Sequence, residues 1–218
     1  MKKQLVIFDL DGTLLDTVAD LANATNQALE QCGYPTHTTD AYYKFVGNGI
    51  NKLIERALPE ADRDMETIMY VKSIFVEYYM QHKTDKSYVY PGINDLLSAL
   101  QDKCIMLAVA SNKYHEATLE MIAHYFPNIN FVKVLGQRDG VPTKPHPQIV
   151  EEILEATGIC KEDVLYVGDS GVDMTTAANA GVDSVGVDWG LRTVEELKAN
   201  KATYIISNPI EILDIIEQ

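Results

Sequence analysis

The sequence has few cysteines, little positive charge and no long apolar run. Its three cysteines (Cys32, Cys104 and Cys160) stand far apart and form no CxxC pair. We therefore expect buried, reduced thiols rather than a disulfide framework or a structural zinc site. Eighteen basic side chains against 32 acidic ones give a formal net charge of −14. Such a balance argues against a nucleic-acid partner and against binding to an anionic membrane surface.

The longest apolar stretches are also too short for targeting or membrane insertion. A membrane-spanning helix needs about 20 apolar residues, and no run in this sequence approaches that length. The N-terminal run at residues 5–8 ends at Asp9, whereas a signal peptide needs an apolar region of about 7–15 residues. The sequence therefore predicts a cytoplasmic protein with no membrane partner.

Short apolar runs rich in valine and isoleucine alternate with amphipathic helical patterns along most of the chain. Runs of this kind, without a polar face, are typical of strands buried on both sides in a parallel sheet. Strand followed by helix, repeated, indicates a doubly wound α/β fold. We predict a Rossmann-like parallel sheet, with strands at residues 5–8, 105–110, 131–135, 164–167, 184–187 and 204–206.

One long stretch interrupts this alternation. Residues 17–87 contain helical patterns near 19–31, 48–57 and 66–80 but no convincing strand. Connections between neighbouring elements are usually much shorter. We therefore predict a small helical cap domain at residues 17–87, inserted after the first strand of a core domain formed by residues 1–16 and 88–218.

Acidic residues follow two of the predicted strands. Asp9 and Asp11 come directly after the first, and Asp169 follows the fourth. Ligands of such sheets bind beyond the carboxyl ends of the strands, so these carboxylates should converge there. Like charges at ~4 Å repel by about 4 kcal/mol at an effective dielectric of 20, so a cation must offset them. Oxygen ligands without histidine or cysteine favour Mg²⁺.

Neutral and positive groups follow other predicted strands. Lys144 supplies a compact positive charge, and Ser111 and Asn112 stand where we expect a helix to begin, with donors suited to an anion. Thr13 can hold the turn after Asp11 and is included with the phosphate-binding residues. Together these groups predict a phosphate site next to the metal site.

In this order, the motifs resemble those of the haloacid dehalogenase superfamily of phosphotransferases. The resemblance covers nearly the whole chain and is carried by DLDGTLLDT at 9–17, ASNK at 110–113, KPHP at 144–147 and GDSGVD at 168–173. The helical insert resembles the small α-helical cap of that superfamily. An acid at Asp11, and glycine before Asp169, favour a phosphatase over the dehalogenase, ATPase and mutase branches.

The resemblance implies a role for each of these residues. Asp9 is the nucleophile that attacks phosphorus, and Asp11 acts first as general acid and then as general base. Ser111 and Lys144 bind the transferring phosphoryl group. Mg²⁺ is held by Asp9, Asp169 and the backbone carbonyl of Asp11, with Asp173 acting on the waters of the metal. These roles are those expected of an enzyme that cleaves a small phosphate ester.

The insert also points to a branch of the superfamily. Residues 43–50 (YKFVGNGI) and 53–58 closely resemble the corresponding cap segment of phosphoglycolate phosphatases, as does the later stretch 187–192. By this resemblance Lys44 could meet a substrate carboxylate and Gly47 could let the backbone approach the ligand. The sequence leaves open whether Arg192 touches substrate and whether Trp189 lines the pocket or packs at the edge of the sheet.

The leading hypothesis is thus a Mg²⁺-dependent phosphomonoesterase for 2-phosphoglycolate. Pyrophosphate, nucleotides and sugar phosphates remain alternative substrates. A phosphomutase is a second reading, in which free phosphate would not accumulate. A non-enzymatic phosphate-binding protein is a third, but a binder needs neither a nucleophile nor an acid. The sequence does not distinguish a monomer from a homodimer.

Overall fold

The computed structural model describes residues 2–217 and divides into two compact units. Unit 1 comprises the chain up to Leu15 together with the chain from Val89 onward, and unit 2 comprises Asp16–Tyr88. At the two chain passages between them, β2 (Leu15–Asp16) pairs with β3 (Tyr88–Val89) in a two-stranded sheet.

Unit 1 is built on a six-stranded parallel sheet with the strand order β5-β4-β1-β6-β7-β8. The chain adds β4 and β5 on one side of β1 and then crosses to add β6, β7 and β8 on the other side. The predicted α/β fold and its six strands are confirmed. The strands are β1 (Leu5–Phe8), β4 (Met106–Tyr114), β5 (Phe131–Gln137), β6 (Val164–Gly168), β7 (Asp183–Val187) and β8 (Tyr204–Ile206).

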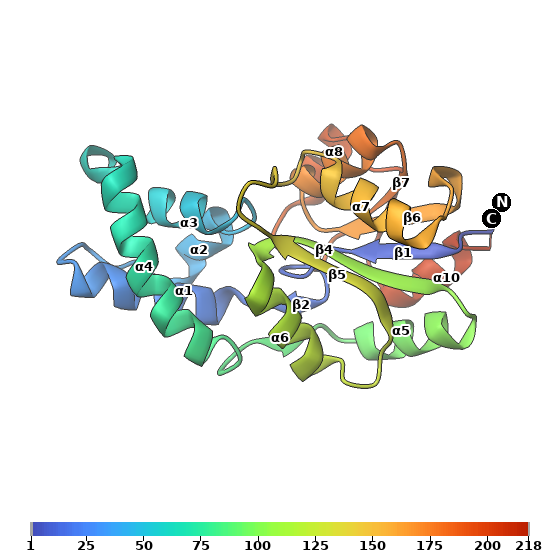
Figure 1. The fold of residues 1–218 in the computed structure, drawn as a ribbon, viewed down its shortest axis with the longest axis horizontal. Coiled ribbons are helices and arrows are strands. Elements are labelled where there is room, and N and C mark those ends of the chain that lie inside the picture. The colour runs from blue at the N-terminus through green and yellow to red at the C-terminus, as the bar shows by residue number, and fades with distance from the viewer. Residues whose placement is uncertain (1, 218) are drawn as a thin grey trace. The chain divides into compact units, whose positions relative to one another are not determined.

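Helices cover both faces of this sheet (Figure 1). One face packs against α5 and α10, with α6 beside them, and the other packs against α7 and α8. The helices of unit 1 are α5 (Ile93–Asp102), α6 (His115–Tyr125), α7 (Gln148–Thr157), α8 (Gly171–Ala180), α9 (Val194–Ala199) and α10 (Ile212–Ile215). Short 3₁₀ turns lie at Lys161–Asp163 and Pro209–Glu211.

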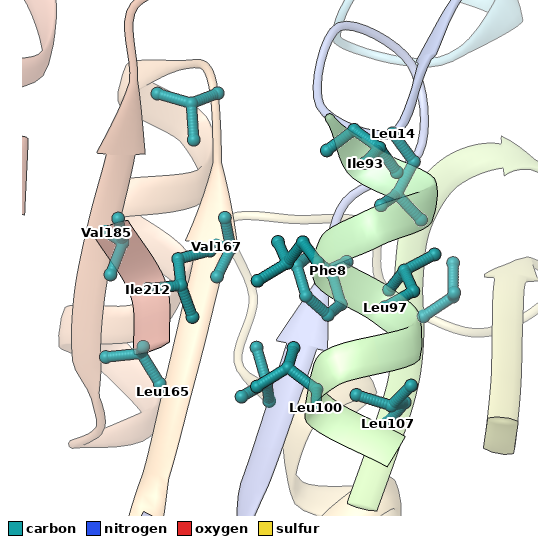
Figure 2. Close-up of a cluster of buried hydrophobic side chains, with 14 of the residues drawn as sticks. Phe8, Leu14, Ile93, Leu97, Leu100, Leu107, Leu165, Val167, Val185 and Ile212 are labelled. Carbon is teal, nitrogen blue, oxygen red and sulfur yellow. The ribbon is translucent and has the colours of Figure 1, made fainter. Parts of the chain in front are cut away.

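Alternate residues of β1 belong to different hydrophobic clusters because side chains of a strand point to opposite faces. Val6 and Phe8 lie in the cluster with Leu97, whereas Leu5 and Ile7 lie in the other. Figure 2 shows the first of these clusters, between the sheet and α5. All four residues of β1 are fully buried, so its last residue delivers the following Asp9 to a fixed position.

Unit 2 is helical, and α1 and α4 pack along each other. Asp20, in the first turn of α1, anchors the segment that follows α4. Its carboxylate accepts hydrogen bonds from the backbone N–H groups of Lys86 and Ser87 and from the Ser87 hydroxyl. The helices are α1 (Val18–Gln31), α2 (Thr39–Phe45), α3 (Ile50–Ala57) and α4 (Met65–His82), with a 3₁₀ turn at Glu60–Asp62. Within residues 2–217, no helix has the length and apolar character that a membrane span requires.

The structure differs from the sequence-based expectation in two respects. Helices α2 and α9 were not predicted, because seven and six residues are too few to establish a helical period. The three cysteines are free, as expected, but the prediction that they are buried is wrong. Cys104 and Cys160 are exposed, and Cys32 is intermediate, because each lies in a chain reversal after a helix rather than inside an element.

Candidate active site

The predicted chemical groups gather at the carboxyl edge of the sheet in unit 1. Asp9 directly follows β1, Asp169 directly follows β6, and Ser111 lies near the end of β4. Lys144 comes from the connection between β5 and α7. Because β4, β1 and β6 are neighbours in the sheet, these side chains meet at its centre. The sheet topology therefore produces the convergence that the motifs imply.

Three carboxylates form the acidic part of this site. Oxygen atoms of Asp9, Asp169 and Asp173 all lie within 4.8 Å of one another. The three residues are 8%, 2% and 0% exposed, so water screens their repulsion poorly. Such a cluster requires compensation by protons or by cations.

Lys144 is a cation that contacts this cluster directly. Its Nζ atom lies 2.9 Å from Asp9 Oδ1 and 2.7 Å from Asp173 Oδ1. Burial alone would lower the pKa of Lys144, but the carboxylates of Asp173 and Asp9 hold it well above its usual value. Lys144 thus stays charged at neutral pH and compensates part of the acidic cluster.

One ammonium group does not compensate three carboxylates. Burial raises the pKa of Asp9 to about 7, with Lys144 opposing the shift and Asp173 and Asp11 adding to it. Burial likewise raises the pKa of Asp169 well above its usual value, with further contributions from Asp173 and Asp9. If no second cation is bound, protons on these carboxyl groups must neutralise part of the negative charge.

Two further residues fix the position of Lys144. Its Nζ atom donates to the Tyr166 hydroxyl over 3.2 Å. The carboxamide of Asn112 binds the Lys144 backbone with both ends, accepting from the N–H over 2.9 Å and donating to the carbonyl over 3.2 Å. The Asn112 side chain therefore holds the lysine, and its expected donation to a phosphate stays a prediction.

The expected position of Ser111 and Asn112 at the start of a helix is wrong. Strand β4 continues to Tyr114, and α6 begins only at His115. The Ser111 hydroxyl accepts from the Lys113 N–H over 3.2 Å, which leaves the hydroxyl proton available to a ligand. At 2% exposure, Ser111 keeps its predicted place in the site as a strand residue rather than as a helix cap.

Lys113 is a site residue that the sequence reasoning missed. Its Nζ atom contacts both carboxylate oxygens of Asp11, at 2.9 and 3.2 Å, and its side chain is only 3% exposed. The motif at 110–113 ends with this lysine, and its position two residues after Ser111 on the same strand was the available signal. Asp11 is thereby oriented separately from the cluster around Asp9.

Asp173 is held by the start of α8. Its Oδ2 atom accepts from the Ser170 hydroxyl over 2.6 Å and from the Ser170 N–H over 3.1 Å, which completes a capping box. Its Oδ1 atom accepts from Lys144 and lies 3.3 Å from the Tyr166 hydroxyl. The protein thus uses both oxygens of Asp173 to fix Lys144 and the helix.

The turn after Asp9 completes the site. Gly12 has a φ of +88°, and a Cβ atom there would lie 2.4 Å from Asp169 Oδ2, so only glycine lets Asp169 approach. The Thr13 hydroxyl is fully buried and has no hydrogen-bond partner in the described part of the chain. Trp189 donates from Nε1 to the Thr13 carbonyl over 3.1 Å.

Arg192 lies in the connection after β7. Its positive charge opposes the rise in the pKa of Asp169. The Arg192 Nε atom lies 3.8 Å from Glu196 Oε1.

The two predicted substrate residues of the insert lie in unit 2. Lys44 is exposed at the end of α2, and Gly47 has a φ of +119° in the connection to α3. Arg56 holds this connection by donating to the Phe45 carbonyl and to Asn48. The roles of Lys44 and Gly47 in binding substrate stay predictions.

The acidic cluster fits a divalent cation. Asp9 Oδ1 is buried and, apart from its ion pair with Lys144, has no aligned hydrogen-bond donor among residues 2–217. If Asp9, Asp169 and Asp173 are all ionised, Lys144 leaves an excess of two negative charges. Buried carboxylate oxygens with that excess are a site for a hard divalent ion.

Comparisons with known proteins place the chain among its relatives. The family model described as haloacid dehalogenase-like hydrolase matches residues 6–187. The phosphoglycolate phosphatases of Vibrio parahaemolyticus and Psychrobacter arcticus are each 32% identical to this chain, covering 98% of it and 96% and 93% of their own lengths. A crystal structure assigned as a phosphoglycolate phosphatase, from Lactobacillus delbrueckii subsp. bulgaricus, superposes with a TM-score of 0.92 at 33% identity over 99% of both chains.

Proposed function

Because this chain belongs to the haloacid dehalogenase-like hydrolases, we propose that it is a Mg²⁺-dependent phosphatase that hydrolyses 2-phosphoglycolate through an aspartyl-phosphate at Asp9. The resemblance found in the motifs is confirmed, and the chain is an enzyme of the phosphoric monoester hydrolase class. The identity of the metal and of the substrate, and the role of each residue, are what we propose here.

The observation that carries the proposal is the buried cluster of three carboxylates, two of which contact Lys144. A structural ion pair would match one charge with one countercharge, since surplus buried charge is costly. Surplus negative charge is instead useful where a cation and a phosphate must be brought together. Mg²⁺ held by Asp9, Asp169 and the Asp11 carbonyl, with Asp173 on its waters, would neutralise charge on the transferring phosphoryl group.

In the first half of the reaction, an Asp9 carboxylate oxygen attacks phosphorus. The bond from phosphorus to the ester oxygen breaks, and Asp11 gives its proton to the departing oxygen. Asp9 must be ionised to attack, and Lys144 at 2.9 Å favours that form. Asp11 lies two residues from Asp9 and is oriented by Lys113. Because the Lys113 ammonium favours a carboxylate in the same way, Asp11 must take up a proton before it can act as the acid.

In the second half, water attacks the phosphorus of the aspartyl-phosphate. Asp11, now ionised, takes a proton from that water, the bond to Asp9 breaks, and inorganic phosphate leaves. Ser111 and Lys144 hold the phosphoryl oxygens throughout. Covalent catalysis by a carboxylate in this way divides one difficult displacement into two easier ones.

We further propose that unit 2 serves as the cap, in which Lys44 selects a substrate with a carboxylate. The support for this substrate is the likeness of the whole chain, insert included, to phosphoglycolate phosphatases at 32% identity. Residues 17–87 and the remainder would then act as the cap and core domains that the sequence predicts.

The test is phosphate release from a panel of phosphomonoesters. Phosphoglycolate, pyrophosphate, nucleoside monophosphates and sugar phosphates are compared at equal concentration, each with Mg²⁺ and with a chelator. The proposal expects Mg²⁺-dependent release that is fastest with phosphoglycolate. Faster release from several other esters would refute the substrate, and release that survives the chelator would refute the metal. Conversion of a sugar phosphate without free phosphate would indicate the mutase reading.

A further inference from the structure

The segment Trp189–Leu191 follows β7. It contacts both segments that form the candidate metal site, which are the turn after β1 and Asp169 after β6. Trp189 Nε1 donates to the Thr13 carbonyl over 3.1 Å. The Leu191 N–H donates to Asp169 Oδ2 over 2.7 Å. One short stretch of chain therefore binds both the turn after β1 and the carboxylate after β6.

Gly190 brings this segment close enough for both contacts. A Cβ atom at Gly190 would lie 2.3 Å from the Asp169 Cβ and 2.4 Å from the Gly12 carbonyl oxygen. On its other side, Asp169 lies equally close to Gly12, where a Cβ would meet Oδ2 at 2.4 Å. The Asp169 side chain is thus enclosed between two glycines, one on each segment.

The Trp189 ring has its own support. It is partly buried and packs against the hydrophobic cluster under the sheet, so its N–H is fixed in direction. The groups that Trp189 helps to position are not well stabilised by their own contacts. Asp9 and Asp169 repel each other, and the buried Thr13 hydroxyl makes no hydrogen bond within residues 2–217.

We propose that Trp189 is a positioning residue, which fixes the turn at residues 9–13 against Asp169 so that the two segments share one metal ion. The proposal rests on the metal site of the proposed function. It assigns no contact between Trp189 and substrate. The indole N–H acts by donating a hydrogen bond to the Thr13 carbonyl. The ring packs against the hydrophobic cluster, and this packing holds the N–H in place.

The experiment compares the protein with Trp189→Phe, which keeps an aromatic ring and removes the N–H. Tyr204→Leu is the matched control, because Tyr204 packs partly buried against the same hydrophobic cluster but lies on β8, at the edge of the sheet away from β1. The first measurement is amide hydrogen exchange in the metal-free proteins. Exchange within residues 10–15, where the N–H groups of Thr13, Leu14 and Leu15 bond to the Leu10 carbonyl, reports the order of the turn.

The second measurement is Mg²⁺ affinity by calorimetry. Loss of one hydrogen bond that supports the ligands is expected to weaken Mg²⁺ binding about three- to ten-fold in Trp189→Phe. Exchange within residues 10–15 should rise, and kcat should fall while KM changes little. Tyr204→Leu should melt at a lower temperature and leave both local exchange and Mg²⁺ affinity unchanged.

Unchanged exchange in Trp189→Phe would overturn the proposal, as would faster exchange with unaltered Mg²⁺ affinity. Equal effects of Tyr204→Leu would also overturn it, because general packing would then explain both. If the unmodified protein bound no Mg²⁺, the proposed function would fail, and the exchange measurement alone would decide whether Trp189 holds the turn. If phosphoglycolate were not hydrolysed but Mg²⁺ bound, only the proposed substrate would be lost.

Discussion

The two edges of the same sheet each bury a lysine, but they treat its charge differently. At the amino edge, Lys3 is 7% exposed and contacts Asp183, whose side chain is 45% exposed, at 2.6 Å. At the carboxyl edge, Lys144 is 4% exposed and contacts the carboxylates of Asp9 and Asp173, which are themselves buried.

This contrast separates a structural ion pair from one that we propose to be functional. Within residues 2–217, Lys3 pairs with the Asp183 carboxylate and also donates to the Glu162 carbonyl over 2.7 Å, and water screens the exposed Asp183 side of the pair. Lys144 faces more negative charge than it can neutralise, in a place that water does not screen. An excess that folding alone would disfavour is evidence that the carboxyl edge is built to receive a cation and a phosphate.

The largest expected effect at the carboxyl edge comes from Asp9→Asn. The variant keeps the shape of the side chain but removes the proposed nucleophile, so phosphate release should fall by about 10⁴-fold or more. Its metal-free form should melt no lower than the unmodified protein, because one charge of the excess is gone. Phosphate release and thermal melting are the measurements, and retained turnover would remove Asp9 from the role of nucleophile.

A direct comparison of the two edges replaces each lysine with methionine. Lys144→Met should reduce kcat/KM by about 10³-fold and destabilise the fold by about 3–5 kcal/mol, because it leaves buried carboxylates without their cation. Lys3→Met should cost about 1 kcal/mol and leave turnover unchanged. Denaturant unfolding and steady-state kinetics test both variants. Similar losses of activity in the two would break the distinction drawn between the edges.

Removing a proposed metal ligand should have a smaller effect that depends on metal. Asp169→Ala should weaken Mg²⁺ affinity about 10- to 100-fold, so that activity partly returns at high Mg²⁺ concentration. The measurement is the Mg²⁺ dependence of phosphate release together with calorimetric binding. An unchanged Mg²⁺ dependence would mean that Asp169 is not a ligand.

The smallest expected effect is a dependence of stability on pH in the metal-free protein. The pKa of Asp9 is raised to about 7, so between about pH 4 and 7 the folded state holds a proton that the unfolded state has lost. Stability should therefore fall as pH rises through this window. Lowering the pH from 8 to 6 should add on the order of 1 kcal/mol from Asp9 alone.

Bound Mg²⁺ should suppress this gain, because the ion competes with the proton for the same oxygens. Thermal melts at pH 6, 7 and 8, in chelator and in saturating Mg²⁺, test the point. Asp9→Asn is the control, since it should lose its share of the pH dependence. A melting temperature that rises with pH in chelator would contradict the excess negative charge at this edge.

The inner strands of unit 1 were predictable because each is a short apolar run that is largely buried, whereas the edge strands β5 and β8 are apolar runs that are partly exposed. Leu5–Phe8 is one of the buried runs, and its end at Asp9 marks both the edge of the sheet and the first site residue. The short helices α2 and α9 were not predictable, since one or two turns carry no clear period. The exposure of Cys104 and Cys160 was missed because it follows from chain reversals, which residue type alone does not specify.

The site was predictable to the extent that its residues stand in motifs next to strands. Asp9, Lys144 and Asp169 each follow or lie near a strand end, and the structure brings them together. The motifs did not show which of their residues contact one another. Lys113 orients Asp11, and the Asn112 carboxamide holds the Lys144 backbone, across separations of 102 and 32 residues.

The sequence by itself determined the fold class, the family and the chemical groups of the site, because apolar period and motif order are local properties of a chain. Only the tertiary structure decided how the charges are balanced. It placed three carboxylates together, with two of them against the Lys144 ammonium, and gave Lys3 a half-exposed carboxylate partner. It also set Trp189 against the Thr13 carbonyl, 176 residues away in the chain. The energies of charges and hydrogen bonds depend on distance in space and on burial, and neither is a function of position along the sequence.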